Sequence, residues 1–184
     1  MATFSNDVKI TNFQLKSTQP IYSNTSWTGQ RIMRSTGIQF YELQFQLNFT
    51  KQAWPEVQNF LAKYSQGGAF TIPMGFLGTY YGTQSGSLTS TSVVPAGSRV
   101  VTTNTNKMAV GEIVRFNNHS KIYQITHRTD NSITVLPALQ RQVQASEIIQ
   151  YNNLDITATL DPDNDYSVVS GNLMSITLKA REVI

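Results

Sequence analysis

Three aspartates at alternating positions, Asp161, Asp163 and Asp165, are the residues whose spacing most resembles a chemical motif. A calcium-binding loop places oxygen ligands at its first, third and fifth positions, with glycine at the sixth and glutamate at the twelfth. This sequence has Tyr166 and Asn172 at those last two positions. We therefore interpret the segment as a solvated turn and predict no metal site.

A Ser-His-Asp arrangement has only two candidates for its base, because the only histidines are His119 and His127. Neither lies in a recognisable nucleophile motif, and their surroundings favour a turn for His119 and a half-exposed strand position for His127. No glycine-rich phosphate-binding motif occurs. The sequence thus predicts no catalytic residues, no cofactor-binding residues and no enzyme activity.

A group of aromatic and basic residues could form a binding surface in the second half of the chain. Its members are Tyr80, Tyr81, Phe116 and Tyr123 together with Arg115, Lys121 and Arg128. Such a set suits a small barrel that binds oligonucleotides or sugars. Core packing of the aromatic residues is the alternative, and we favour it.

Composition narrows the class of protein. Of the 184 residues only 14% are charged, the formal net charge of +3 comes from scattered Lys and Arg, and cysteine is absent. Scattered charge argues against a specific nucleic-acid partner, and the lack of cysteine excludes a disulfide framework. No run of about 18 apolar residues occurs, so we predict a soluble chain without a membrane partner.

The elements that position these residues are predicted from hydrophobic periodicity. Alternating apolar residues indicate a long strand over 39–49, and apolar residues spaced by three and four indicate an amphipathic helix over about 51–66, with Thr50 as its cap. A strand with a bulge is expected over 8–15. Residues 26–33 are expected to form a hairpin with the strand that follows Gly37.

The remaining strands are predicted in two groups. Short runs punctuated by turns are 88–94, 98–103, 112–116, 122–127 and 133–136, and two clean alternating strands are 154–160 and 174–181. We therefore predict a mainly β fold: a β-sandwich with one packed α-helix, formed by residues 1–81 and 148–184. An inserted small β-barrel or sandwich module occupies residues 82–147.

The order of these elements resembles that of the distal tail proteins, or closely related minor tail proteins, of long-tailed bacteriophages. The resemblance covers the strand and helix of 45–68, the Ala-Phe-Thr-Ile-Pro segment at 69–73, Gly78-Thr79, and the β segments 109–116, 121–125 and 133–139. It implies a tail-tube type of β-sandwich that assembles as a six-fold ring between the tail tube and the tail tip or baseplate.

What the resemblance implies agrees with the absence of catalytic motifs. We expect a structural virion protein, assembled in the host cytoplasm, whose partners are copies of itself, the tail tube protein and tail tip or hub proteins. In some relatives such a module resembles carbohydrate-binding or oligonucleotide-binding folds, which would allow contact with a host-surface glycan, but no defined sugar site aligns with this insertion, so glycan binding is not carried over. The alternative is a carbohydrate- or nucleic-acid-binding module that acts through the inserted barrel.

Overall fold

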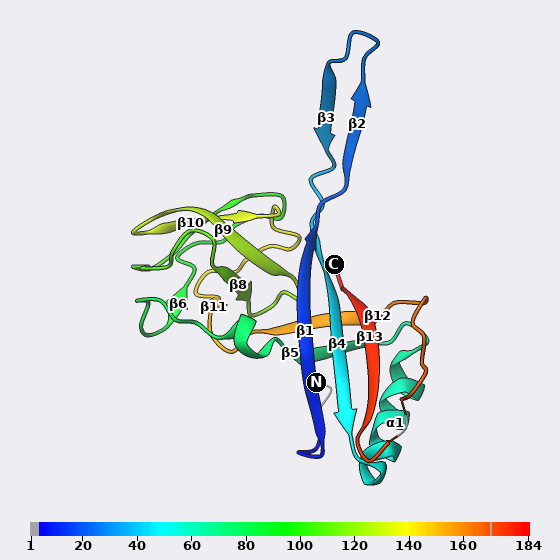
Figure 1. Ribbon diagram of the computed structural model, residues 1–184. Coiled ribbons are helices and arrows are strands. Elements are labelled where there is room, and N and C mark those ends of the chain that lie inside the picture. Colours follow the sequence, from blue (N-terminus) through cyan, green and yellow to red (C-terminus); the bar gives the residue numbers. More distant parts are fainter. Residues whose placement is uncertain (1–3, 170) are drawn as a thin grey trace. The chain divides into compact units, whose positions relative to one another are not determined.

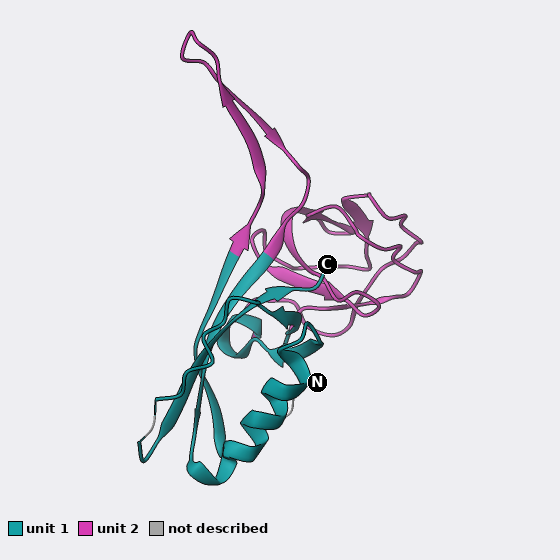
Figure 2. Ribbon diagram, turned by 90° about the vertical axis from the view of Figure 1, so that its right-hand side faces the viewer, with its two compact units in different colours: residues 1–16, 41–78, 153–184 teal, residues 17–40, 79–152 magenta. Residues whose placement is uncertain are grey.

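The computed structural model describes residues 4–169 and 171–184, which form a mainly β fold with a single α-helix (Figure 1). The chain divides into two compact units (Figure 2). Unit 1 comprises residues 1–16, 41–78 and 153–184, and unit 2 comprises residues 17–40 and 79–152. None of the described helices is long and apolar enough to cross a membrane.

Unit 1 contains a curled five-stranded sheet. In sheet order its strands are β1 (Val8–Thr18), β4 (Phe40–Phe49), β13 (Met174–Glu182), β12 (Asp155–Leu160) and β5 (Ala69–Pro73). β13 pairs with β4 over eight residue pairs but with β12 over only three, so the sheet bends where β12 and β13 meet. Figure 1 accordingly shows β12 and β5 crossing β1 and β4 at a steep angle.

The helix of unit 1 packs through an aromatic cluster. A 3-10 turn (Lys51–Ala53) leads into α1 (Trp54–Tyr64), which buries Val57, Phe60 and Leu61. The Phe60 ring lies 5.2 Å from that of Phe70 on β5, and Trp54 stacks on Phe49 of β4 at 5.7 Å. The helix therefore covers the apolar face of the curled sheet, as its predicted stripe requires.

Unit 2 contains a six-stranded sheet that closes into a barrel. In sheet order its strands are β6 (Leu88–Thr89), β11 (Ile148–Gln150), β8 (Ile113–Phe116), β9 (Ile122–Thr129), β10 (Ser132–Leu136) and β7 (Val100–Thr102). Ser90 and Thr103 form a bridge between the segments that follow β6 and β7, the two outer strands. The interior is filled by side chains such as Phe116, Tyr123 and Ile125.

Unit 2 also contains a two-stranded hairpin, which we call the arm (residues 20–37). β2 (Ile21–Thr25) pairs with β3 (Arg31–Ser35), and every residue of both strands is exposed. Gly29 has a φ of +85° in the turn between them, a conformation that favours glycine. The predicted hairpin between residues 26–33 and the strand after Gly37 is therefore wrong, because β4 lies between β1 and β13.

Residues 79–152 leave unit 1 and return to it at two positions that lie close together. A 3-10 helix (Gly75–Gly78) ends there, and the Gly78 carbonyl accepts the N–H of Leu154 at 3.0 Å. A Cβ on Gly78 would lie 2.6 Å from the Leu154 carbonyl oxygen. The chain thus departs from unit 1 and returns to it at adjacent backbone positions.

The mainly β fold with one helix, predicted from the sequence, is confirmed. The inserted segment extends beyond its predicted limits of 82–147, because β11 (Ile148–Gln150) is a strand of the barrel and pairs with β6 and β8. The predicted cap of the helix is wrong, since the Thr50 side chain makes no capping hydrogen bond and 3-10 residues precede α1.

Candidate functional site

The three alternating aspartates lie in the connection between β12 and β13. Both carboxylate oxygens of Asp165 bind Ser167, through its N–H at 3.0 Å and its hydroxyl at 3.1 Å. Among the described residues no group of three or more His, Asp or Glu side chains is placed to hold a metal ion. The segment is a turn on the rim of a groove that is described below.

His119 is buried in the turn between β8 and β9. Its Nδ1 lies 2.9 Å from the Tyr123 hydroxyl, which also accepts the N–H of Gln140 at 3.2 Å. Burial lowers the pKa of His119, and the nearby Glu147 carboxylate offsets this only in part. Burial therefore favours the neutral form of His119, whereas His127 lies exposed on β9.

The aromatic and basic residues of the second half do not share one surface. Phe116, Tyr123 and Lys121 are buried, so core packing is the correct interpretation for the two aromatics. The Arg115 guanidinium binds the side chain of Gln150 at 2.6 Å.

The other members are dispersed. Arg128 pairs with Asp130 at 3.6 Å, and the Tyr80 ring packs edge-on against Tyr151 at 4.9 Å. Tyr81 is exposed.

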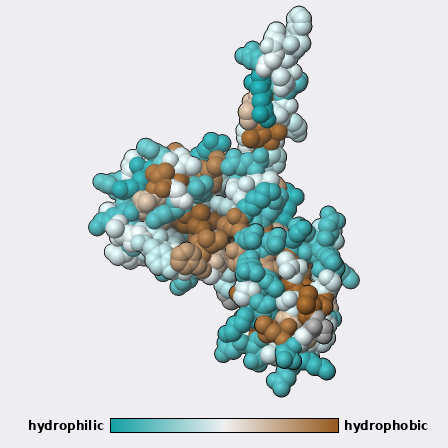
Figure 3. All heavy atoms as spheres, viewed as in Figure 1, coloured by the Kyte–Doolittle hydropathy of each residue, from teal (hydrophilic) through white to brown (hydrophobic). Residues whose placement is uncertain are grey.

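The arm is the surface feature that the sequence analysis missed. Trp27, in its turn, is 100% exposed, and Tyr22, Ile32 and Met33 are 72%, 63% and 56% exposed. Figure 3 shows a brown, apolar group at the base of this hairpin, while the rest of it is pale to teal. Large apolar side chains in such number are normally covered in a folded protein, so the arm has the composition of a contact surface.

Both faces of the arm carry this composition. The register places Ile21, Met33 and Arg31 on one face. It places Tyr22, Ile32 and Arg34 on the other. A ribbon that lies flat on one partner needs only one apolar face, so this pattern favours a partner that encloses the arm. No acidic residue occurs between Ser17 and Phe40, and this absence is the sequence signal that could have identified the arm.

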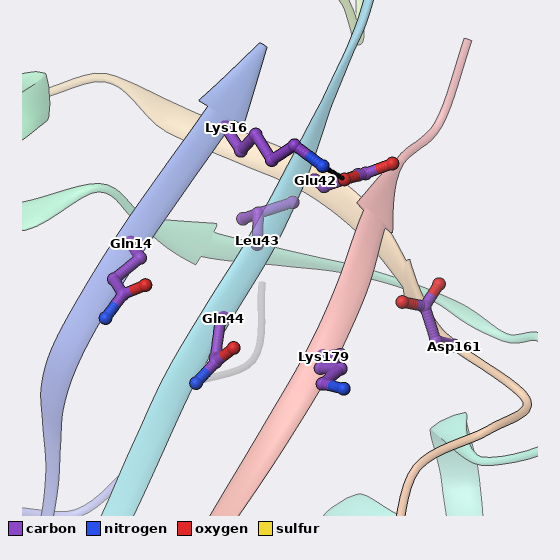
Figure 4. Close-up of a pocket in the computed structure, with 7 residues that line it drawn as sticks. All are labelled: Gln14, Lys16, Glu42, Leu43, Gln44, Asp161 and Lys179. Carbon is purple, nitrogen blue, oxygen red and sulfur yellow. Dashed lines mark hydrogen bonds and ion pairs between the residues drawn. The ribbon is translucent and has the colours of Figure 1, made fainter. Parts of the chain in front are cut away.

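A groove on unit 1 has the opposite character. Two shallow hollows meet at Lys179 on the polar face of β4 and β13, beside residues 161–169. Figure 4 shows Asp161, Glu42 and Lys179 around one of them. Asp163, Asp165 and the 70% exposed Val169 line the other. We call these hollows together the acidic groove.

Negative charge is in surplus in the acidic groove. The two cations that line the groove are Lys16 and Lys179, and Lys16 already binds Glu42 at 2.9 Å. Partial burial raises the pKa of Asp161, and repulsion from Glu42 and Asp163 adds to the shift, despite attraction by Arg181 and Lys179. An additional cation in the groove would therefore be stabilised.

The charge imbalance extends to the whole of each unit. Unit 2 has eight Lys and Arg against three Asp and Glu, while unit 1 has six against eight. Two surfaces of complementary character are thus present, the basic, apolar arm on unit 2 and the acidic groove on unit 1. No protein-family model matches the sequence, and no curated protein matches it either.

Proposed function

We propose that this protein is a structural virion protein of a bacteriophage tail, whose copies form a ring that joins the tail tube to the tail tip or baseplate. The exposed arm is the observation that carries this proposal. Every residue of its two strands is exposed, and a partner that covered them would gain about 1.5–3 kcal/mol for each large apolar residue that it fully buried.

The sheet of unit 1 also supports assembly. β1 and β5 are its two edges, and β1 is 11 residues long. Edge strands of that length present unpaired backbone groups that natural proteins cover or use for association. A heterologous contact between copies must close into a ring or else extend into a filament, and a ring fits a connector in a tail. The six-fold number comes only from the family resemblance.

The partners and location follow from this proposal. The ring would contact the tail tube protein on one side and tip or hub proteins on the other, in a virion assembled in the host cytoplasm. Its function is positional, without a cofactor or a catalytic step.

Native mass spectrometry and negative-stain microscopy from micromolar concentrations upward, with and without a tail tube partner, test the proposal. We expect closed rings in the wild type and their loss in Trp27→Ser, with an unchanged melting temperature because Trp27 is fully exposed. Val110→Ser, which removes another exposed apolar side chain of unit 2, is the matched control and should leave the rings intact. A wild type that stays monomeric under every condition would contradict the proposal.

A second candidate function is binding of carbohydrate or nucleic acid through the barrel. The excess of basic residues in unit 2 and the exposed Tyr81 favour it, whereas the packed barrel interior leaves only the outer surface for a ligand. A glycan array and a single-stranded oligonucleotide titration distinguish the two candidates. Tight binding by a strictly monomeric protein would favour the barrel.

A further inference from the structure

We propose that the arm of one copy docks into the acidic groove of a second copy. This inference rests on the ring proposed above and names the two surfaces that meet. The occupant is a second copy because the same chain carries both an arm without a single acidic residue and a groove with four lining carboxylates.

Charge complementarity is the first argument. The arm carries Arg31 and Arg34, which lie on opposite faces of the ribbon. Of the groove carboxylates, Glu42 already binds Lys16 and Asp165 already binds Ser167. The other two are Asp161 and Asp163. Burial and the Glu42 carboxylate raise the pKa of Asp161, and Asp163 adds a smaller repulsion. A guanidinium beside these two carboxylates would relieve the repulsion and form charge-assisted hydrogen bonds.

Shape and apolar character give the second argument. The two hollows are lined by residues of the β4–β13 face and by residues of the 161–169 segment, so a docked arm would contact both. Val169, which is 70% exposed, lines the groove and offers apolar surface. The arm presents Ile21 and Met33 on one face and Tyr22 and Ile32 on the other. Each face of the arm therefore brings both an arginine and apolar side chains to a groove that offers both kinds of contact.

The contact is heterologous, because arm and groove are different surfaces of the same chain. Every copy then donates one arm and receives one, which is the arrangement that closes into a ring. Charge pairs across such a contact affect both partner choice and affinity, and like charges placed opposite each other cost several kcal/mol.

Charge reversal on each side, followed by mixing, tests the inference. The first variant is R31E/R34E, which reverses the arm, and the second is D161K/D163K, which reverses the groove. Alone, each should require on the order of 100-fold higher concentration to assemble, because like charges then face each other. Mixed in equal amounts they should assemble as the wild type does, since the reversed arm fits the reversed groove and the two unchanged surfaces still match.

The mixture gives a distinctive readout. Native mass spectrometry should show assemblies that contain equal numbers of the two variants, which a contact within one chain cannot produce. R99E/R141E makes the same charge change at exposed positions of the barrel and should assemble normally. Melting curves establish that each variant is folded, and D161N/D163N, with a smaller expected loss, replaces D161K/D163K if the lysines unfold unit 1.

The outcomes separate this inference from the function on which it rests. A wild type that forms no assembly overturns both. Wild-type rings together with reversed variants that assemble equally well, or with a mixture that does not recover, overturn only the arm-to-groove contact. Assembly that is lost in each reversed variant by itself and recovered in their mixture supports the arm-to-groove contact.

Discussion

In unit 1 a helix covers the apolar face of the curled sheet, and the sheet has two edge strands. In unit 2 the bridge between Ser90 and Thr103 closes the sheet into a barrel, which encloses its own core. A closed barrel has no edge to protect, while an open sheet needs a cover or a partner. The arm adds to this contrast, because it carries exposed apolar surface without any core. The barrel thus encloses its own core, whereas unit 1 has two edge strands and the arm has exposed apolar side chains.

The largest expected effect tests whether the two cores are independent. Phe116→Ala in the barrel and Phe60→Ala in unit 1 should each lower the free energy of unfolding by about 3–5 kcal/mol, because both side chains are buried. Helical circular dichroism reports on unit 1 alone, since α1 is the only described α-helix. We expect Phe60→Ala to lower the midpoint of that signal and Phe116→Ala to leave it in place. Equal shifts from both variants would show that the units unfold together.

A smaller effect is expected where the chain departs from unit 1. Gly78→Ala would place its Cβ 2.6 Å from the carbonyl oxygen of Leu154, and backbone must move to accept it. The expected cost is about 1–3 kcal/mol, measured by denaturant unfolding of unit 1. Gly171→Ala, where the nearest such atom lies at 3.4 Å, is the control and should have little effect.

A pH effect on stability is expected in the barrel. Burial lowers the pKa of His119, so the folded barrel binds a proton less readily than the unfolded chain does. Barrel stability should therefore fall as pH falls from above 6.5 toward the folded pKa, and remain lower below it. His119→Gln can retain the contact with Tyr123 but does not titrate, so its thermal melts should lose this pH dependence. An unchanged dependence would place the titrating group elsewhere.

The smallest expected effect concerns the acidic groove. Burial, Glu42 and Asp163 raise the pKa of Asp161, so its ionised form is disfavoured in the folded state and the penalty is present above the folded pKa. Asp161→Asn should therefore stabilise unit 1 at neutral pH, by less than about 1 kcal/mol because the group is partly exposed. The same variant should weaken assembly if the groove receives the arm. Asp7→Asn, at an exposed position, is the control for both measurements.

The elements with one buried face were predictable from the sequence, and those without one were not. β4 and β13 alternate between buried and more exposed positions, and α1 has a clear apolar stripe, so their periods of 2 and 3.6 appear in the sequence. In the arm Ile21 and Tyr22 are adjacent, as are Ile32 and Met33, because both faces are apolar and exposed. No period indicates such a hairpin.

The candidate site was predictable only in part, for related reasons. The alternating aspartates marked a turn correctly, but their position beside the β4–β13 face depends on how strands far apart in sequence pair. The burial of His119 and Lys121 likewise depends on barrel closure, and β11 is only three residues long, too short for a periodic signal. The position of the aspartates, the burial of His119 and Lys121, and the formation of β11 all depend on long-range strand pairing, which local sequence does not encode.

The hydrogen bond between Gly78 and Leu154 has a consequence for how this protein can diversify. Because the segment from 79 to 152 begins and ends at adjacent backbone positions, a different domain with neighbouring termini can occupy the same place without a change in the register of β5 and β12. An exchange of that kind would leave the strand pairing of unit 1 unchanged. Gly78 and Leu154 thereby mark the boundary between unit 1 and the segment that can be replaced.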